Sequence, residues 1–405
     1  MITSEPGTTA LTIVPVELHL VEPSVAERMI PPPADALTAA QREELVAEEP
    51  LSLLHVLGPE GDDGATAGRI AGDRIRELVA ANRYRYRGSC FAVHELATSD
   101  HRQRGLIVGI PLEDVRGGQV RAHEQTRADR ERRLADFLDA AGMDVSPVVL
   151  THPAVDELGA LVDEVASGEP DLDFTGWHGV AHRVWMIEDP ERRARLAKAA
   201  GAIEALTIVD GHHRVAAALA SQTTDTLLAE LVPDGALRMV GYDRRVVLED
   251  PDVPARVVAG LSDVGEVQPL GDGIPQRPSG DSEVLVGTSE GWHRVTFREV
   301  PDELPDRLPA ALLQERLLAP MLGITDPRTD PRLEYVPGLD DLAELHRSLW
   351  PAPTLAFVPR AITVAELLEI AEAGRMLPPK STYVDPKPGP GVLLRLRVRR
   401  MVTDP

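Results

Sequence analysis

The chain has 405 residues, enough for two or three domains that each bury a hydrophobic core. Asp and Glu outnumber Lys and Arg by 65 to 42, and the net charge of −23 is spread along the chain. Such a surface repels polyanions, so no nucleic-acid partner is expected. The single cysteine, Cys90, excludes an internal disulfide and any metal site built from several cysteines. These features leave the oligomeric state open.

The first apolar run, at 10–20, is interrupted by Pro15, Glu17 and His19, and no basic segment precedes it. This pattern differs from that of a signal peptide. Nowhere does the chain reach the roughly 18 uninterrupted apolar residues that a membrane span needs. We therefore expect a cytoplasmic protein with no membrane partner.

Helices and strands alternate along the chain. Helical spacing of apolar residues, together with capping residues, predicts helices at 39–48, 65–82, 128–141, 155–166, 190–200, 309–322 and 363–372. Short apolar runs bounded by turn residues predict strands at 89–97, 105–111, 147–150, 183–187 and 206–209. Strands and turns dominate from Gly235 to Val300. The pattern indicates an α+β (mixed α/β) fold. We predict an N-terminal extension at 1–30, an α/β core at 31–235 and a C-terminal α/β subdomain at 236–405.

The polar segment Asp210-Gly-His-His-Arg214 lies between a predicted strand and an Ala-rich predicted helix. Gly211 allows the backbone to turn or to approach a ligand closely. The start of the helix offers unpaired N–H groups and a partial positive charge, which suit an anion. Arg214 adds a fork for phosphate or carboxylate. The plainer alternative is that Asp210 caps the helix and its neighbours are solvated.

Two other polar segments have chemical content. In His123-Glu-Gln-Thr126, a carboxylate beside an imidazole at a loop–helix junction could supply a general base, a metal ligand or a helix cap. In Pro378-Pro-Lys-Ser-Thr-Tyr383, an ammonium, two hydroxyls and backbone donors could bind phosphate, although a simple surface turn has the same composition. The spacing of a P-loop is absent.

Four ordered motifs make this sequence similar to the prokaryotic domain-of-unknown-function family numbered ten-fifteen. They are Pro32-Pro-Ala-Asp35, His123-Glu-Gln-Thr126, Asp210-Gly-His-His-Arg214 and Met376-Leu-Pro-Pro-Lys-Ser-Thr-Tyr383. The chain departs from the family pattern in three places. A family tyrosine is Ala34, Leu377 is inserted into the last motif, and a family histidine is replaced around Tyr242-Asp-Arg244.

A shorter stretch, Asp210–Arg214, resembles the nucleotide-phosphate motif of the ParB/sulfiredoxin-like fold, which includes free-serine kinases. The resemblance implies that the turn and the helix start hold nucleotide phosphates, and that an acidic residue elsewhere activates the substrate hydroxyl. It implies a ParB/sulfiredoxin-like nucleotide-binding core with an additional α/β subdomain.

These observations together predict a nucleotide-dependent phosphotransferase, with ATP or ADP as donor, acting on a small hydroxyl substrate such as free serine or a serine-like metabolite. Glu124 is the expected general base, with His123 orienting it and His213 contacting phosphate or exchanging protons. Asp210 is also the expected Mg²⁺ ligand. The expected phosphate-binding residues are Asp210, Gly211, His212, His213, Arg214, Lys380, Ser381 and Thr382, and the expected substrate-binding residues are Thr126 and Asp35.

Two other functions fit the same residues. A non-enzymatic nucleotide-binding switch or scaffold would be stabilised by nucleotide without turnover. A metal-assisted hydrolase would use His123, Glu124, Asp210 and His212 around a metal ion.

Overall fold

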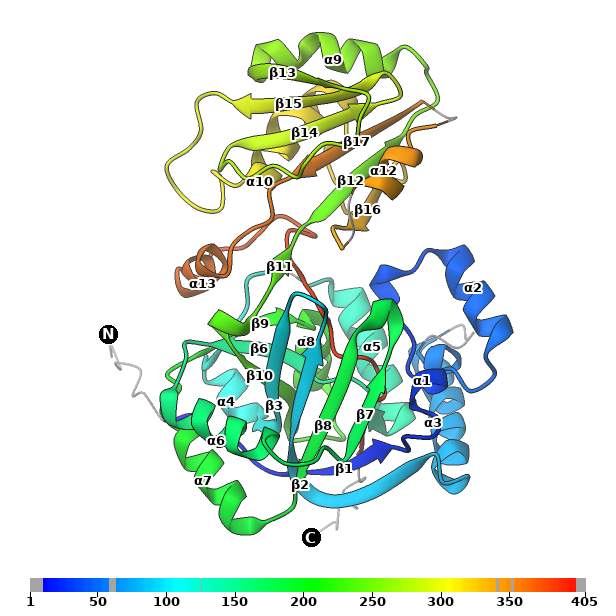
Figure 1. The fold of residues 1–405 in the computed structure, drawn as a ribbon, viewed down its shortest axis with the longest axis vertical. Coiled ribbons are helices and arrows are strands. Elements are labelled where there is room, and N and C mark those ends of the chain that lie inside the picture. Colours follow the sequence, from blue (N-terminus) through cyan, green and yellow to red (C-terminus); the bar gives the residue numbers. More distant parts are fainter. Residues whose placement is uncertain (1–9, 58–62, 125, 340–341, 351–352, 398–405) are drawn as a thin grey trace. The chain divides into compact units, whose positions relative to one another are not determined.

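The structure is a computed structural model, and it describes residues 10–57, 63–124, 126–339, 342–350 and 353–397. Contacts between Cα atoms divide the chain into two compact units. The described residues of the first unit fall within Met1–Ala122, Thr126–Leu237 and Pro386–Pro405. Those of the second fall within His123–Gln125 and Arg238–Asp385. The chain thus passes into the second unit twice, and each unit has its own sheet (Figure 1).

The first unit is built on a mixed sheet to which eleven strands of the described residues belong. Its strands are β1 Val16–Val21, β2 Tyr84–Ala97, β3 Arg102–Pro111, β4 Val120–Arg121, β5 Met143–Asp144, β6 Val148–His152, β7 Leu172–Thr175, β8 Ala181–Ile187, β9 Leu206–Asp210, β10 Thr226–Pro233 and β19 Leu393–Leu396. The order is β4-β9-β6-β10-β3-β2-β1-β19-β5, with β8 joined to β2 and β7 to β8. Pairs β6–β10 and β4–β9 are parallel, and the other pairs are antiparallel.

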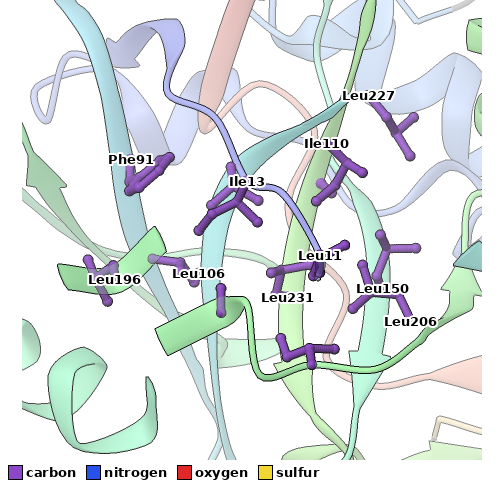
Figure 2. Close-up of a cluster of buried hydrophobic side chains, with 14 of the residues drawn as sticks. Leu11, Ile13, Phe91, Leu106, Ile110, Leu150, Leu196, Leu206, Leu227 and Leu231 are labelled. Atoms are coloured by element: carbon purple, nitrogen blue, oxygen red, sulfur yellow. The ribbon is translucent and has the colours of Figure 1, made fainter. Parts of the chain in front are cut away.

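Alternation of side chains along these strands separates two hydrophobic cores on opposite faces of the sheet. One contains Phe91, Leu106, Leu150, Leu206 and Leu231 together with the N-terminal residues Leu11 and Ile13 (Figure 2). The other contains Ala92, Ile107 and Leu228 from the same strands. Both faces are therefore covered.

The helices of the first unit are α1 Ala26–Met29, α2 Ala39–Glu48, α3 Gly64–Ala80, α4 Leu112–Arg116, α5 Ala128–Ala141, α6 Asp156–Ala166, α7 Pro190–Ala200 and α8 His212–Ala220. Glycines at 64, 68 and 72 recur every fourth residue on α3 and face the backbone of α5. A Cβ at Gly68 would lie 2.3 Å from the carbonyl oxygen of Phe137. The two helices can therefore approach closely only because these positions lack side chains.

The second unit contains a six-stranded antiparallel sheet and a two-stranded one among its described residues. The larger sheet has the order β13-β15-β14-β17-β12-β16, and the smaller pairs β11 with β18. The bounds are β11 Met239–Val240, β12 Tyr242–Val247, β13 Gly265–Gly271, β14 Glu283–Thr288, β15 Gly291–Phe297, β16 Leu333–Pro337, β17 Thr354–Pro359 and β18 Tyr383–Val384.

Helices cover both faces of the larger sheet. The helices of this unit are α9 Val253–Val264, α10 Pro309–Leu313, α11 Ala319–Leu322, α12 Ala343–Arg347 and α13 Val364–Glu372, with a π-helical stretch at Gln314–Leu318 joining α10 to α11. Residues of α9, α10 and α11 pack with Val246 and Phe357 on one face. Leu345 of α12 packs with Trp292 on the other. No helix among the described residues is long and apolar enough to cross a membrane.

The mixed α/β class and most predicted elements are confirmed. The helices at 39–48, 128–141 and 190–200 have the predicted bounds, and Thr38 forms a capping box with Gln41. The strands at 89–97 and 105–111 form a hairpin whose first strand begins earlier, at Tyr84. Helix α9 was not predicted within the strand-rich region, because three valines and a proline at 253–258 resemble a strand with a turn. The ParB/sulfiredoxin-like core and the predicted domain boundaries stay predictions.

His182 is buried beside His94 in the first unit, and it makes stability depend on pH. Burial and the neighbouring His94 lower the pKa of His182 to about 3. The imidazole of His182 binds a proton near pH 6.5 in the unfolded chain but not in the native protein. Its contribution to stability is therefore complete above pH 6.5 and falls as the pH drops toward 3. Each pH unit in that window costs about 1.4 kcal/mol. We expect His182→Gln to flatten urea-unfolding free energies between pH 6.5 and 4.5. An unchanged slope would contradict this assignment, and His55→Gln, at a half-buried position, is the control.

Candidate functional site

The segment Asp210–Arg214 forms a strand–turn–helix junction in the first unit. Strand β9 ends at Asp210, Gly211 takes the left-handed conformation with φ 101°, and α8 begins at His212. Gly211 is the N-cap residue and no side chain caps the helix, so the alternative in which Asp210 is the cap is wrong. The carbonyl oxygen of Gly211 accepts hydrogen bonds from the backbone N–H groups of Arg214 (2.8 Å) and Val215 (3.0 Å).

Asp210 is the centre of an ion-pair cluster. Its Oδ1 accepts a hydrogen bond from Lys387 Nζ at 2.8 Å, and its Oδ2 accepts one from Arg214 Nη2. Arg214 also donates to the carbonyl oxygen of Pro147. Burial alone would raise the pKa of Asp210, but the charges of Lys387 and Arg214 outweigh it and hold the pKa far below its usual value. Asp210 is therefore ionised at neutral pH.

Lys387 joins Asp210 to Asp35. Its Nζ lies 2.6 Å from Asp35 Oδ2, and its side chain is 9% exposed. The two carboxylates raise the pKa of Lys387 against the opposing effect of burial. Asp35 was predicted to bind substrate, whereas Lys387 was not predicted at all. A signal was present, because Lys198, Lys380 and Lys387 are the only three lysines in a chain with 42 basic residues.

The two histidines of the junction differ in environment. His212 is buried, and burial lowers its pKa to about 4, against the opposing charge of Asp210. Its imidazole is thus neutral at pH 7 and adds no positive charge. His213 is half-buried. The positive charge at the start of α8 therefore comes from Lys387, Arg214 and the helix itself.

The second and fourth motifs are in contact within the second unit. The backbone N–H of Leu377 donates to the carbonyl oxygen of His123 at 2.8 Å, and His123 is fully buried. Glu124 is half-buried, and Gln125 lies outside the described residues. Thr126 belongs to the first unit, where its hydroxyl donates to Glu131. The backbone hydrogen bond therefore links the two motifs directly. Thr126 and its partner Glu131 both belong to the first unit.

Lys380 has an unusual backbone and an aromatic partner. Its φ of 54° is a left-handed conformation that non-glycine residues rarely adopt. Its Nζ donates to Tyr242 Oη at 3.2 Å and lies 4.7 Å from the centre of that ring. Ser381 is buried and its hydroxyl donates to the carbonyl oxygen of Pro378 at 2.7 Å. Thr382 is half-buried.

The predicted Mg²⁺ ligand does not fit its role. Both carboxylate oxygens of Asp210 are already bound by cations, Lys387 and Arg214. A divalent ion prefers several carboxylate and water oxygens without competing cations. Over the ranges that the structure describes, no group of three or more His, Cys, Asp and Glu residues is arranged to hold a metal ion. In this structure Lys387 and Arg214 neutralise the charge of Asp210.

The sequence profile of a family described as "Protein of unknown function (DUF1015)" matches residues 13–317. The chain belongs to this family. The family match includes three of the four motifs, whereas Pro378–Tyr383 lies beyond its end. No curated protein matches the chain.

Several solved structures are weakly similar to this chain. A mutant form of a free serine kinase in complex with ADP has 15% identity and a TM-score of 0.37, with 69% of this chain and 87% of that chain covered. SbnI from Staphylococcus aureus, truncated at its C-terminus, has 9% identity and a TM-score of 0.40, with 74% and 90% covered. A conserved hypothetical protein from Pyrococcus furiosus has 15% identity and a TM-score of 0.39, with 72% and 95% covered.

Gly211 provides a local test of the junction. A Cβ there would be 3.0 Å from Arg214 Nε and Nη2, on a backbone with φ 101°. Gly211→Ala should therefore cost about 1–2 kcal/mol of stability in backbone strain and displace the guanidinium. Thermal unfolding measures the loss. Gly235→Ala, where a Cβ meets no heavy atom within 4 Å, is the control. Equal stability of the two variants would contradict the expectation.

Proposed function

We propose that the chain is a nucleotide-dependent phosphotransferase acting on a small hydroxyl substrate, such as free serine or a serine-like metabolite. The observation that supports this most is the cluster at the start of α8, where Lys387 and Arg214 meet Asp210 beside the left-handed turn at Gly211. Phosphoryl transfer needs positioned positive charge and backbone donors, and this junction offers both. The resemblance of Asp210–Arg214 to the nucleotide-phosphate motif of the ParB/sulfiredoxin-like fold agrees with it.

In this proposal the phosphates bind at Gly211, the N–H groups of α8, His213 and Arg214. Lys387 pairs with Asp35, and Asp35 accepts a hydrogen bond from the substrate hydroxyl. Glu124 stays the proposed general base, and His123 stays the residue proposed to orient it. ATP or ADP is the proposed donor. A metal-assisted hydrolase gains no support, because Asp210 is engaged by two cations.

The direct test is product formation. Purified protein is incubated with ATP or ADP, Mg²⁺ as the nucleotide's counter-ion, and a panel of hydroxy-amino acids, and phosphorus NMR follows the products. A new phosphomonoester signal that depends on protein and acceptor is expected. In the wild type, nucleotide at 100 times its Kd should stabilise the protein by about 2.7 kcal/mol, which raises the melting temperature. His213→Ala should lose this stabilisation. Nucleotide binding without any phosphorylated product would favour the non-enzymatic switch or scaffold.

A further inference from the structure

Arg244 is a buried guanidinium without a carboxylate partner among the described residues. It lies on β12 of the second unit and is 3% exposed. Its hydrogen-bond acceptors are the backbone carbonyl oxygens of Tyr242, at 2.6 Å, and Lys380, at 3.5 Å. The neighbouring Asp243 points to the opposite side of the strand, where both of its oxygens accept hydrogen bonds from Arg277 at 2.9 Å. Both carboxylate oxygens are thus hydrogen-bonded to Arg277, while the charge of Asp243 still acts on Arg244.

A second cation lies in the same cluster. The Lys380 ammonium donates to the Tyr242 hydroxyl, and no carboxylate of the described residues lies within ion-pair distance of it. Two like charges thus share Tyr242 as a neighbour. The left-handed backbone of Lys380, with φ 54°, is the kind of strain that proteins retain where a side chain must be held in place.

Aromatic rings surround these cations. Tyr335 and Tyr383 both meet the ring of Tyr242 edge-on, with centroids 6.2 and 5.4 Å away. The guanidinium of Arg244 lies 5.5 Å from the centre of Tyr335. Three of the chain's five tyrosines are therefore gathered at one place. Ring faces attract cations, but this attraction replaces only part of the hydration that a buried guanidinium loses.

An anion would complete this arrangement. A buried charge is tolerated when it is paired. Arg244 and Lys380 form no ion pair within 4 Å among the described residues, so the two cations suit a ligand with about two negative charges. A phosphate monoester carries about −1.5 to −2 at pH 7, whereas a carboxylate carries only one charge. A cavity of about 10 Å³, room for a single water molecule, lies beside the guanidinium, and Tyr242, Arg244, Arg360 and Ser381 are among its lining residues. The planar fork of arginine and the point charge of lysine both suit phosphate oxygens.

We propose that Arg244 and Lys380 form a phosphate-binding site in the second unit, with Tyr242, Tyr335 and Tyr383 as its aromatic wall. The proposal rests on the proposed phosphotransferase function, keeps the phosphate-binding role that the sequence predicts for Lys380, and adds Arg244 as the buried anchor. Burial raises the pKa of Tyr335, and the charge of Arg244 opposes that rise.

The test observes the tyrosines directly, so that it reports on this site alone. Protein labelled with 3-fluorotyrosine is titrated with inorganic phosphate at pH 7.5 and constant ionic strength, and fluorine NMR follows the five signals, assigned by Tyr→Phe variants. Saturable shifts of the Tyr242, Tyr335 and Tyr383 signals are expected, while those of Tyr84 and Tyr86 stay in place. Arg244→Met and Lys380→Met should each weaken phosphate binding at least tenfold.

The matched control is Arg245→Met, because Arg245 is next in the same strand and already pairs with Glu334. Its phosphate affinity should equal that of the wild type. Unmoved tyrosine signals, shifts that survive in Lys380→Met, or equal shifts with acetate would each overturn the proposal. Lys380→Met decides the matter if Arg244→Met does not fold, since the Lys380 side chain is partly exposed. The readout does not need turnover, so it separates this site from failure of the phosphotransferase function.

Discussion

Replacing Lys387 by methionine is expected to destabilise the first unit by about 3–5 kcal/mol, the usual cost of breaking a buried ion pair from one side. The ammonium holds Asp210 Oδ1 at 2.8 Å and Asp35 Oδ2 at 2.6 Å. Methionine would preserve the packing of the chain but leave Asp210, which is largely buried, with only Arg214 as a counter-charge. Urea unfolding at pH 7 measures the loss.

Lys198→Met is the matched control for this variant. Lys198 is exposed on α7, so its replacement should change stability by less than about 0.5 kcal/mol. The same pair of variants tests the proposed function, because removal of Lys387 also removes positive charge next to the proposed phosphate-binding turn at Asp210–Arg214. Nucleotide affinity should fall in Lys387→Met and stay unchanged in Lys198→Met. Equal stabilities of the two variants would show that the cluster around Asp210 contributes little.

Glu124→Gln should reduce turnover by about 10²–10⁴-fold if Glu124 is the general base, because an amide of the same shape cannot accept the substrate proton. Nucleotide binding should remain, since the proposed phosphate-binding turn at Asp210–Arg214 does not include Glu124. Rates of phosphomonoester formation at saturating donor and acceptor measure the effect. Separate determination of kcat and KM distinguishes loss of chemistry from loss of substrate affinity.

An exposed carboxylate on α12, Glu344, supplies the control, and Glu344→Gln should match the wild type. A decrease of less than about tenfold in Glu124→Gln would exclude general-base catalysis by this residue. Asp35 would then be the carboxylate to test next. Its carboxylate pairs with Lys387 and is still partly exposed.

The alternation of helix and strand patterns was sufficient to predict much of the secondary structure. Local signals explain this success: Thr38 and Asp189 cap their helices, and apolar residues recur on the buried face of α5. The same local rules failed at α9, where β-branched residues form a helix because its apolar side packs on the sheet of the second unit. Long-range packing decided that segment.

The chain by itself determined which polar segments stand out, including Asp210–Arg214 and the segment that contains Lys380. Only the tertiary structure decided their partners. Lys387 is 177 positions from Asp210 and 352 from Asp35, and no local pattern links residues so far apart. Arg244 likewise reads as one of many arginines until folding buries it beside Lys380 and Tyr335. Charge pairing and burial arise from the packing of distant segments, and these set the chemistry of both sites.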